Sequence, residues 1–226
     1  MVTLLFVQSM VIIWKCFRLM LIAAVFVFAA VPIVAQVKAT TKPIKHKPAS
    51  NQLKEFLHLA ADANVTFIYP SGFREINAPN DEYSSFDYGL ELPGKEFEIW
   101  FQIKSEKENW ASYINAQNTQ SGQLANPDSL YNDLGAAQAI AFTGDKNYFI
   151  RTIPTNVLVR YHADAGKSYL LTLLDLARTK HYKYALLITL QKNHTGTILA
   201  VCFTNEKGPE FFKNIDKAAH CLKFKS

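Results

Sequence analysis

Cysteine is scarce in this chain of 226 residues, which has only Cys16, Cys202 and Cys221. No two of them form a Cys-x-x-Cys motif, so thiol redox catalysis has no support in the sequence. Cys202 falls in a strand-like run and Cys221 near the end of a helix-like run, a spacing that fits a helix packed on a sheet. In an oxidising compartment the two can form a disulfide, and the alternative is two isolated buried thiols.

A basic surface is also missing from the part of the chain that is expected to fold. The formal charge is +5, but six of the 24 basic residues lie in the first 47 positions, where no acidic residue occurs. The remaining chain has 18 basic against 19 acidic residues. Because a nucleic-acid-binding domain needs a basic stripe on its folded surface, we exclude that class.

The sequence also lacks the motifs that indicate a catalytic serine nucleophile or a nucleotide-binding loop. No serine lies in a Gly-x-Ser-x-Gly turn. The stretch from Tyr161 ends in Gly166-Lys167-Ser168, as a phosphate-binding loop does, but such a loop needs a second glycine where Tyr161 stands. We therefore expect neither a nucleotide nor another cofactor. Residues 164–167 are instead predicted to be a turn that joins strands at residues 157–162 and 168–174.

The one long hydrophobic run lies near the N-terminus. Lys15 and Arg18 precede an apolar stretch at residues 19–31, and small residues follow it. This order is typical of a secretory signal peptide, so we expect residues 1–35 to be removed on export. The alternative is an uncleaved membrane anchor, because the uncharged residues 19–37 are almost enough to span a bilayer.

Composition changes twice after this run. Residues 36–52 carry proline, lysine and threonine with few apolar side chains, and they are predicted to form a flexible basic linker. From Leu53 onward the apolar residues become periodic. Residues 53–226 are therefore expected to form a single folded domain.

Hairpins dominate the pattern of this domain. Apolar side chains alternate over residues 86–92 and 97–103, on either side of Pro93-Gly94. A second pair of alternating runs, residues 184–190 and 197–203, flanks the turn Asn193-His194-Thr195-Gly196. Because no regular alternation of strand and helix occurs, these pairs predict the α+β class, with an antiparallel β-sheet that has one buried face and is covered by helices.

Helical spacing occurs in three segments, residues 53–60, 126–141 and 211–222. Trp100 needs a separate explanation, because it lies on the side of its strand opposite the apolar residues. It either contacts a covering helix or marks an exposed binding surface. We favour the covering helix.

A short motif connects this chain with a known fold. Residues 67–73 read Phe-Ile-Tyr-Pro-Ser-Gly-Phe, an F-x-x-P-x-G-[WF] pattern, and strands, a helix, further strands and a closing helix follow. In this motif and order of elements, residues 62–226 resemble the Mog1/PsbP-like fold, and the chain is similar to secreted proteins of Bacteroidetes-type bacteria. The resemblance implies a non-catalytic binding or assembly protein, and it carries no catalytic residue over to this chain.

Three polar residues are candidates for ligand binding. His162 and Asp164 point to the same side of the expected strand, because side chains alternate along a strand. With Lys167 they can form a polar cluster at one end of the sheet. The alternative is a solvated strand end, since two potential ligands are too few for a metal site.

The sequence as a whole predicts a secreted or periplasmic, non-catalytic binding or accessory protein of the cell envelope. Its expected partner is another exported or envelope protein, and it contacts the membrane only if the leader stays attached. The alternative function is an exported hydrolase or metal-dependent enzyme that uses His162 and Asp164.

Overall fold

The computed structural model describes residues 49–80, 85–119 and 124–226, which belong to one compact unit, Pro48–Ser226. The predicted signal peptide lies outside the described residues, as does most of the predicted linker. Within the described ranges, every helix falls short of the length and hydropathy that a bilayer span requires.

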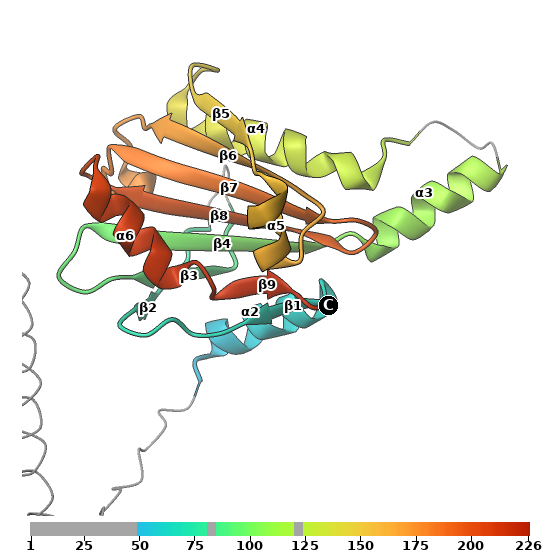
Figure 1. Ribbon diagram of the computed structural model, residues 1–226, viewed down its shortest axis with the longest axis horizontal. Helices are drawn as coiled ribbons and strands as arrows, with labels where there is room; N and C mark the ends of the chain where they lie inside the picture. Colours follow the sequence, from blue (N-terminus) through green and yellow to red (C-terminus); the bar gives the residue numbers. More distant parts are fainter. Residues whose placement is uncertain (1–48, 81–84, 120–123) are drawn as a thin grey trace, which may run out of the picture. The chain divides into compact units, whose positions relative to one another are not determined.

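A seven-stranded antiparallel sheet forms the centre of this unit (Figure 1). Its strand order is β2-β3-β4-β8-β7-β6-β5, and each neighbouring pair is antiparallel. In that order the strands are β2 (Arg74–Ile76), β3 (Tyr88–Glu91), β4 (Phe97–Ser105), β8 (Gly196–Thr204), β7 (Tyr184–Lys192), β6 (Ala165–Thr172) and β5 (Phe149–Thr152). With helices packed on this sheet, the structure confirms the predicted α+β class.

The two predicted hairpins supply the centre of the sheet. The turn between β3 and β4 contains Gly94, whose φ of 74° lies in the left-handed region that glycine enters without a steric penalty. In the turn between β7 and β8, His194 has a φ of 58°. Because β4 pairs with β8 along its whole length, the two hairpins join into one continuous sheet.

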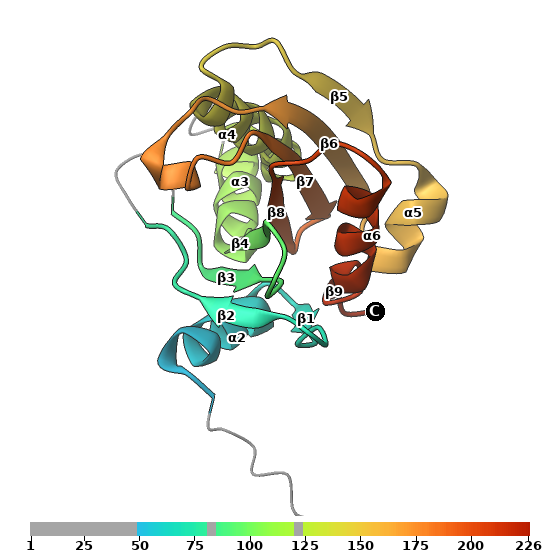
Figure 2. The same ribbon diagram turned by 90° about the vertical axis from the view of Figure 1, so that its left-hand side faces the viewer.

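Both faces of the sheet are buried, so the prediction of a single buried face is wrong. Figure 2 shows α5 (Thr155–Tyr161) and α6 (Pro209–Ala218) on one side of the sheet and α4 (Leu130–Thr143) on the other. The alternating runs predicted from the sequence are divided between the two faces. One face carries the alternating residues of β4 and β7, such as Ile99, and the other carries those of β8, such as Leu199, together with Trp100.

Trp100 is completely buried beneath α4, which confirms the expectation of a covering helix. Its ring lies 4.1 Å from that of Phe203, which in turn contacts Phe142 of α4 at a centroid distance of 5.6 Å. Trp100 Nε1 donates a 2.9 Å hydrogen bond to Glu98 Oε2. Glu98 Oε1 accepts a 2.7 Å hydrogen bond from Lys180 Nζ, so the buried carboxylate has partners for both oxygens.

Helix starts lie close to their predicted positions. Helix α2 (Asn51–Asp62) begins after Ser50, whose hydroxyl oxygen accepts a hydrogen bond from the Leu53 backbone amide at 3.0 Å. The last two residues of the predicted linker therefore belong to this helix. Asn126 caps a 3₁₀ turn, η1 (Pro127–Ser129), and α4 follows directly. Helix α3 (Lys107–Thr119) and the 3₁₀ turn η2 (Ala177–Thr179) complete the set of described helices.

The strand predicted at residues 157–162 is wrong, because this segment is helix α5. His162 ends the helix in a left-handed conformation with a φ of 52°. The turn predicted at residues 164–167 is also wrong, since β6 begins within it. Val157 and Tyr161 satisfy the period of a strand, but they also lie four residues apart and share one face of a helix.

A second, two-stranded sheet joins early and late parts of the unit. Strand β1 (Val65–Phe67) pairs antiparallel with β9 (Leu222–Phe224). The predicted closing helix includes Leu222, but α6 ends at Ala218 and the chain then becomes extended. The extended segment β9 lies on the same side of the main sheet as α5 and α6 (Figure 2).

Candidate ligand cavity

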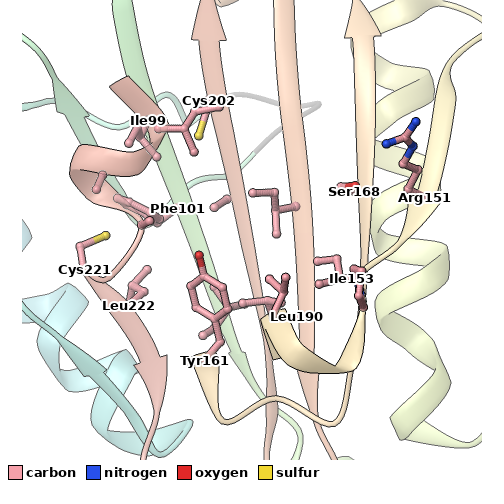
Figure 3. A pocket seen from close by; sticks show the side chains of 18 of the residues that line it. Ile99, Phe101, Arg151, Ile153, Tyr161, Ser168, Leu190, Cys202, Cys221 and Leu222 are labelled. Carbon is pink, nitrogen blue, oxygen red and sulfur yellow. The ribbon is translucent and has the colours of Figure 1, made fainter. Parts of the chain in front are cut away.

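A cavity of about 350 Å³ lies between the main sheet and α5, α6 and β9 (Figure 3). Ligand pockets in proteins usually measure roughly 300–1,000 Å³, so this cavity is large enough for a small organic molecule. Its floor is the face of the sheet opposite Trp100. The floor residues come from β4, β8 and β7: Ile99, Phe101, Ile198, Ala200, Cys202, Ile188 and Leu190.

Two helices form much of the wall. On α5, Val157 and Tyr161 line the cavity, whereas Val159 faces away from it and is 64% exposed. On α6, Ile215 and Ala218 line it. Residues three or four apart lie on one side of a helix, so each helix presents an apolar stripe to the cavity.

Of the described residues that line the cavity, Arg151 alone carries a charged side chain. It lies on β5, directly opposite Ser168 of β6, which also lines the cavity. The guanidinium carbon lies 4.8 Å from the centre of the Phe149 ring, a cation–π contact. Since Arg151 is exposed, this end of the cavity reaches solvent.

Tyr161 places a hydroxyl group in the apolar part of the cavity (Figure 3). Burial raises the pKa of this hydroxyl above its usual range, and the nearby thiols of Cys221 and Cys202 raise it further. The hydroxyl therefore stays protonated at neutral pH. Among the described residues it has no hydrogen-bond partner, so it is free to donate to a ligand.

Cys202 and Cys221 are free, buried thiols that both line the cavity. Burial raises the pKa of Cys202 far above its usual range and that of Cys221 to about 12. Both groups are therefore neutral at physiological pH, and a neutral thiol is a poor nucleophile and a poor metal ligand. They behave here as apolar wall residues.

The three predicted ligand-binding residues lie outside this cavity, and each has its own surroundings. His162 Nδ1 lies 2.8 Å from the carbonyl oxygen of Phe224. Asp164 accepts hydrogen bonds from the turn between β7 and β8, at 2.9 Å from the Asn193 amide and 3.1 Å from Lys192 Nζ.

Lys167 lies on β6, two residues after the strand begins. The described contacts join it neither to His162 nor to Asp164. The three residues do not form the predicted cluster because that cluster depends on a regular strand through His162. The chain instead forms a helix that ends at His162.

Gly166, the glycine of the apparent phosphate loop, is a packing residue within β6. A Cβ atom at this position would lie 2.8 Å from the carbonyl oxygen of Thr189 and 3.0 Å from the side chains of Ile153 and Leu190. Such close approach leaves room for glycine alone. The glycine therefore lets β6 pack under the segment that leads into α5.

A second cluster of polar residues, centred on His194, joins the β7–β8 turn to the segment before α4. His194 Nε2 lies 3.2 Å from Asp128 Oδ2, and the Asp128 carboxylate also accepts from the His194 backbone amide at 2.7 Å. The ring of Trp110, on α3, stacks on His194 with a centroid distance of 3.8 Å. These contacts occupy both the ring face and the Nε2 atom of His194. The cluster therefore holds the β7–β8 turn in place.

Sequence reasoning missed the cavity and its polar residues, although one local signal was present. Pro154 precedes Thr155 at the start of α5, and proline near the first turn is a common start signal for a helix. Recognising it would have placed Val157 and Tyr161 on one helical face. Arg151 has no sequence signal, because its role depends on the pairing of β5 with β6.

No group of three or more histidine, cysteine, aspartate or glutamate side chains converges on a common metal position within the described part of the chain. Comparison of the sequence with models of known protein families gives no match, and comparison with curated proteins gives none either.

Proposed function

We propose that this protein is an exported, non-catalytic binding protein that holds a small apolar molecule in the cavity between the sheet, α5 and α6. One observation carries the proposal: the cavity is built almost entirely from aliphatic, aromatic and thiol-bearing side chains. Pockets of this composition bind ligands mainly by removing apolar surface from water.

The polar groups of the cavity favour binding over catalysis. General acid–base catalysis needs a group whose pKa lies near the working pH. The pKa values of Tyr161, Cys202 and Cys221 are all raised, so the three groups remain protonated. None of the described lining residues is a histidine, aspartate or glutamate. A base that activates a nucleophile is thus missing from this set of residues.

Export and an accessory role in the cell envelope complete the proposal. The charged and apolar pattern of residues 1–35 supports a cleaved signal peptide. The antiparallel sheet with helices on both sides is compatible with the Mog1/PsbP-like fold, whose members include binding and assembly proteins. The alternative enzyme has weaker support, because His162 and Asp164 are engaged by different parts of the chain.

Two valines on the same helix make a matched test. Val157 lines the cavity, and Val159 is exposed on the outer side of α5. N-phenyl-1-naphthylamine, an uncharged fluorescent apolar probe, is titrated into the wild type, Val157→Trp and Val159→Trp. We expect saturable binding to the wild type, about tenfold weaker binding to Val157→Trp because the indole fills the cavity, and unchanged binding to Val159→Trp.

Absence of saturable binding to the wild type would contradict the proposed function, as would equal effects of the two tryptophans. Circular dichroism of each variant checks that the fold is retained. Export is tested separately by mass measurement of the mature N-terminus from the native host. Cleavage near residue 35 supports a secreted or periplasmic protein, and an intact leader supports the membrane-anchored alternative.

A further inference from the structure

We infer that the cavity takes a single-chain amphipathic anion, whose acidic head group lies at Arg151 and Ser168 and whose apolar chain runs toward Cys221. This inference rests on the proposed function and specifies the class of ligand. Figure 3 shows the two polar residues toward one end of the cavity and Cys221 toward the other.

Arg151 is a cation that lines the cavity without an ion-pair partner among the described residues. Most lysines and arginines of the described chain likewise form no ion pair with a carboxylate, so what distinguishes Arg151 is its place in the cavity wall. Its guanidinium lies on the face of the Phe149 ring. This contact restrains the guanidinium but uses none of its N–H donors.

Ser168 gives the head-group position a second donor. It pairs directly with Arg151 in the β5–β6 register, and both side chains line the cavity. The Ser168 hydroxyl makes no hydrogen bond to a described residue. A guanidinium fork beside a hydroxyl matches the two oxygens of a carboxylate, which accept parallel N–H bonds.

The opposite end of the cavity excludes a second charge. Ile99, Cys202, Cys221 and Leu222 lie there, and the two thiols are neutral. A charged group at this end would lose its hydration without gaining a counter-ion. The cavity therefore suits a molecule that is polar at one end and hydrocarbon at the other.

Three compounds that share a twelve-carbon chain and differ in head group provide the probes. Dodecanoate, dodecanol and dodecyltrimethylammonium, each below its micellar concentration or solubility limit, compete with N-phenyl-1-naphthylamine on the full-length wild type. We expect dodecanoate to bind about five- to tenfold more tightly than dodecanol, a modest factor because Arg151 is partly screened by solvent. Dodecyltrimethylammonium should bind more weakly than dodecanol, because its cation meets Arg151.

Variants of two arginines distinguish an effect of Arg151 on the head group from an effect of the protein's net charge. Arg160 lies on α5, is exposed and does not line the cavity, so Arg160→Gln removes the same charge outside the site. Arg151→Gln is expected to lower dodecanoate binding to the level of dodecanol and leave dodecanol binding unchanged. Arg160→Gln is expected to leave the preference in place. Arg151→Lys keeps the positive charge but lacks the forked guanidinium donors, so it should retain part of the preference for dodecanoate over dodecanol.

A series of fatty acids from six to sixteen carbons tests the position of the chain. Affinity should rise by about fourfold for each methylene that enters the cavity and stop rising once it is full.

The outcomes that overturn the inference differ from those that overturn the proposed function. Equal binding of dodecanoate and dodecanol to the wild type, or an equal loss in the two glutamine variants, refutes the head-group position alone. Failure of the uncharged probe and of all three dodecyl compounds to bind refutes the binding function itself. The wild-type comparison decides the inference even if Arg151→Gln fails to fold.

Discussion

Gly135 of α4 lies directly against the ring of Tyr169 on β6: a Cβ atom on Gly135 would come within 2.7 Å of the Tyr169 hydroxyl oxygen and 2.8 Å of ring carbon Cε2. Tyr169 is 1% exposed, so its ring is enclosed by neighbouring parts of the protein. The glycine thus fixes how closely α4 packs on its face of the sheet.

Gly135→Ala is therefore expected to destabilise the protein, although alanine is the better helix former. Overpacking a rigid site costs about 1–3 kcal/mol, while the gain in helix propensity is about 1 kcal/mol. We expect a net loss of about 1 kcal/mol in the free energy of unfolding, measured by urea denaturation. A more stable variant would show that α4 can move away from β6 at little cost.

Tyr169 should also make stability depend on alkaline pH. Burial raises the pKa of its hydroxyl to about 12, from 10.0 in an unfolded chain. Between these values the unfolded chain loses the proton while the folded protein keeps it, so stability falls by about 1.4 kcal/mol per pH unit from this group. The contribution is fully present below pH 10 and is lost as the pH rises toward 12.

The measurement compares unfolding free energies of the wild type and Tyr169→Phe at a series of pH values from 8 upward. The phenylalanine variant should lose stability less steeply above pH 10. Tyr113→Phe on α3 controls for loss of a hydroxyl. Identical slopes in the wild type and Tyr169→Phe would contradict the prediction.

The buried carboxylate of Glu98 is expected to matter more than its lysine partner. Glu98 is 5% exposed and accepts hydrogen bonds from Trp100 and Lys180. Glu98→Ala leaves the indole N–H without a partner and opens a gap, so we expect a loss of about 2–4 kcal/mol. The Lys180 side chain is 47% exposed, so water can replace it in Lys180→Ala at a cost of about 1 kcal/mol.

Denaturant unfolding of Glu98→Ala, Lys180→Ala and the double variant gives the coupling between the two positions. A larger loss in Lys180→Ala than in Glu98→Ala would overturn this order.

The two cavity thiols should resist modification in the folded protein. Both are buried and their pKa values are raised, so iodoacetamide at pH 8 meets almost no thiolate. We expect labelling of Cys202 and Cys221 only after denaturation, as measured by peptide mass mapping. Ser168→Cys, at the end of the cavity near exposed Arg151, is the reactive control. Absence of labelling after denaturation without reductant would show instead that the two cysteines form a disulfide.

Local sequence patterns were sufficient for the four strands of the two central hairpins. The alternation around Pro93-Gly94 and across residues 184–203 predicts the two hairpins, since period two and turn chemistry are both local properties. The parity of Trp100 also favoured a covering helix over an exposed binding surface, and its burial bears this out.

Local sequence patterns did not predict the short segment at residues 155–161 or the cavity. Residues 155–161 fit both periods because the segment is only two turns long, and packing against the sheet decides in favour of the helix. The cavity depends on how α5, α6 and β9 lie over β4 and β8, and these elements come from distant parts of the sequence. The pairing that brings Arg151 to Ser168 is likewise a tertiary property.

The pairing of β1 with β9 has a consequence for the time at which the chain can fold. Val65 is in register with Phe224, so this small sheet cannot close until the chain has been synthesised past Phe224. Contacts of such long sequence separation form late, because loop closure must come first. A growing chain therefore lacks one wall of its cavity until β9 has been made, a delay that is compatible with the export proposed above.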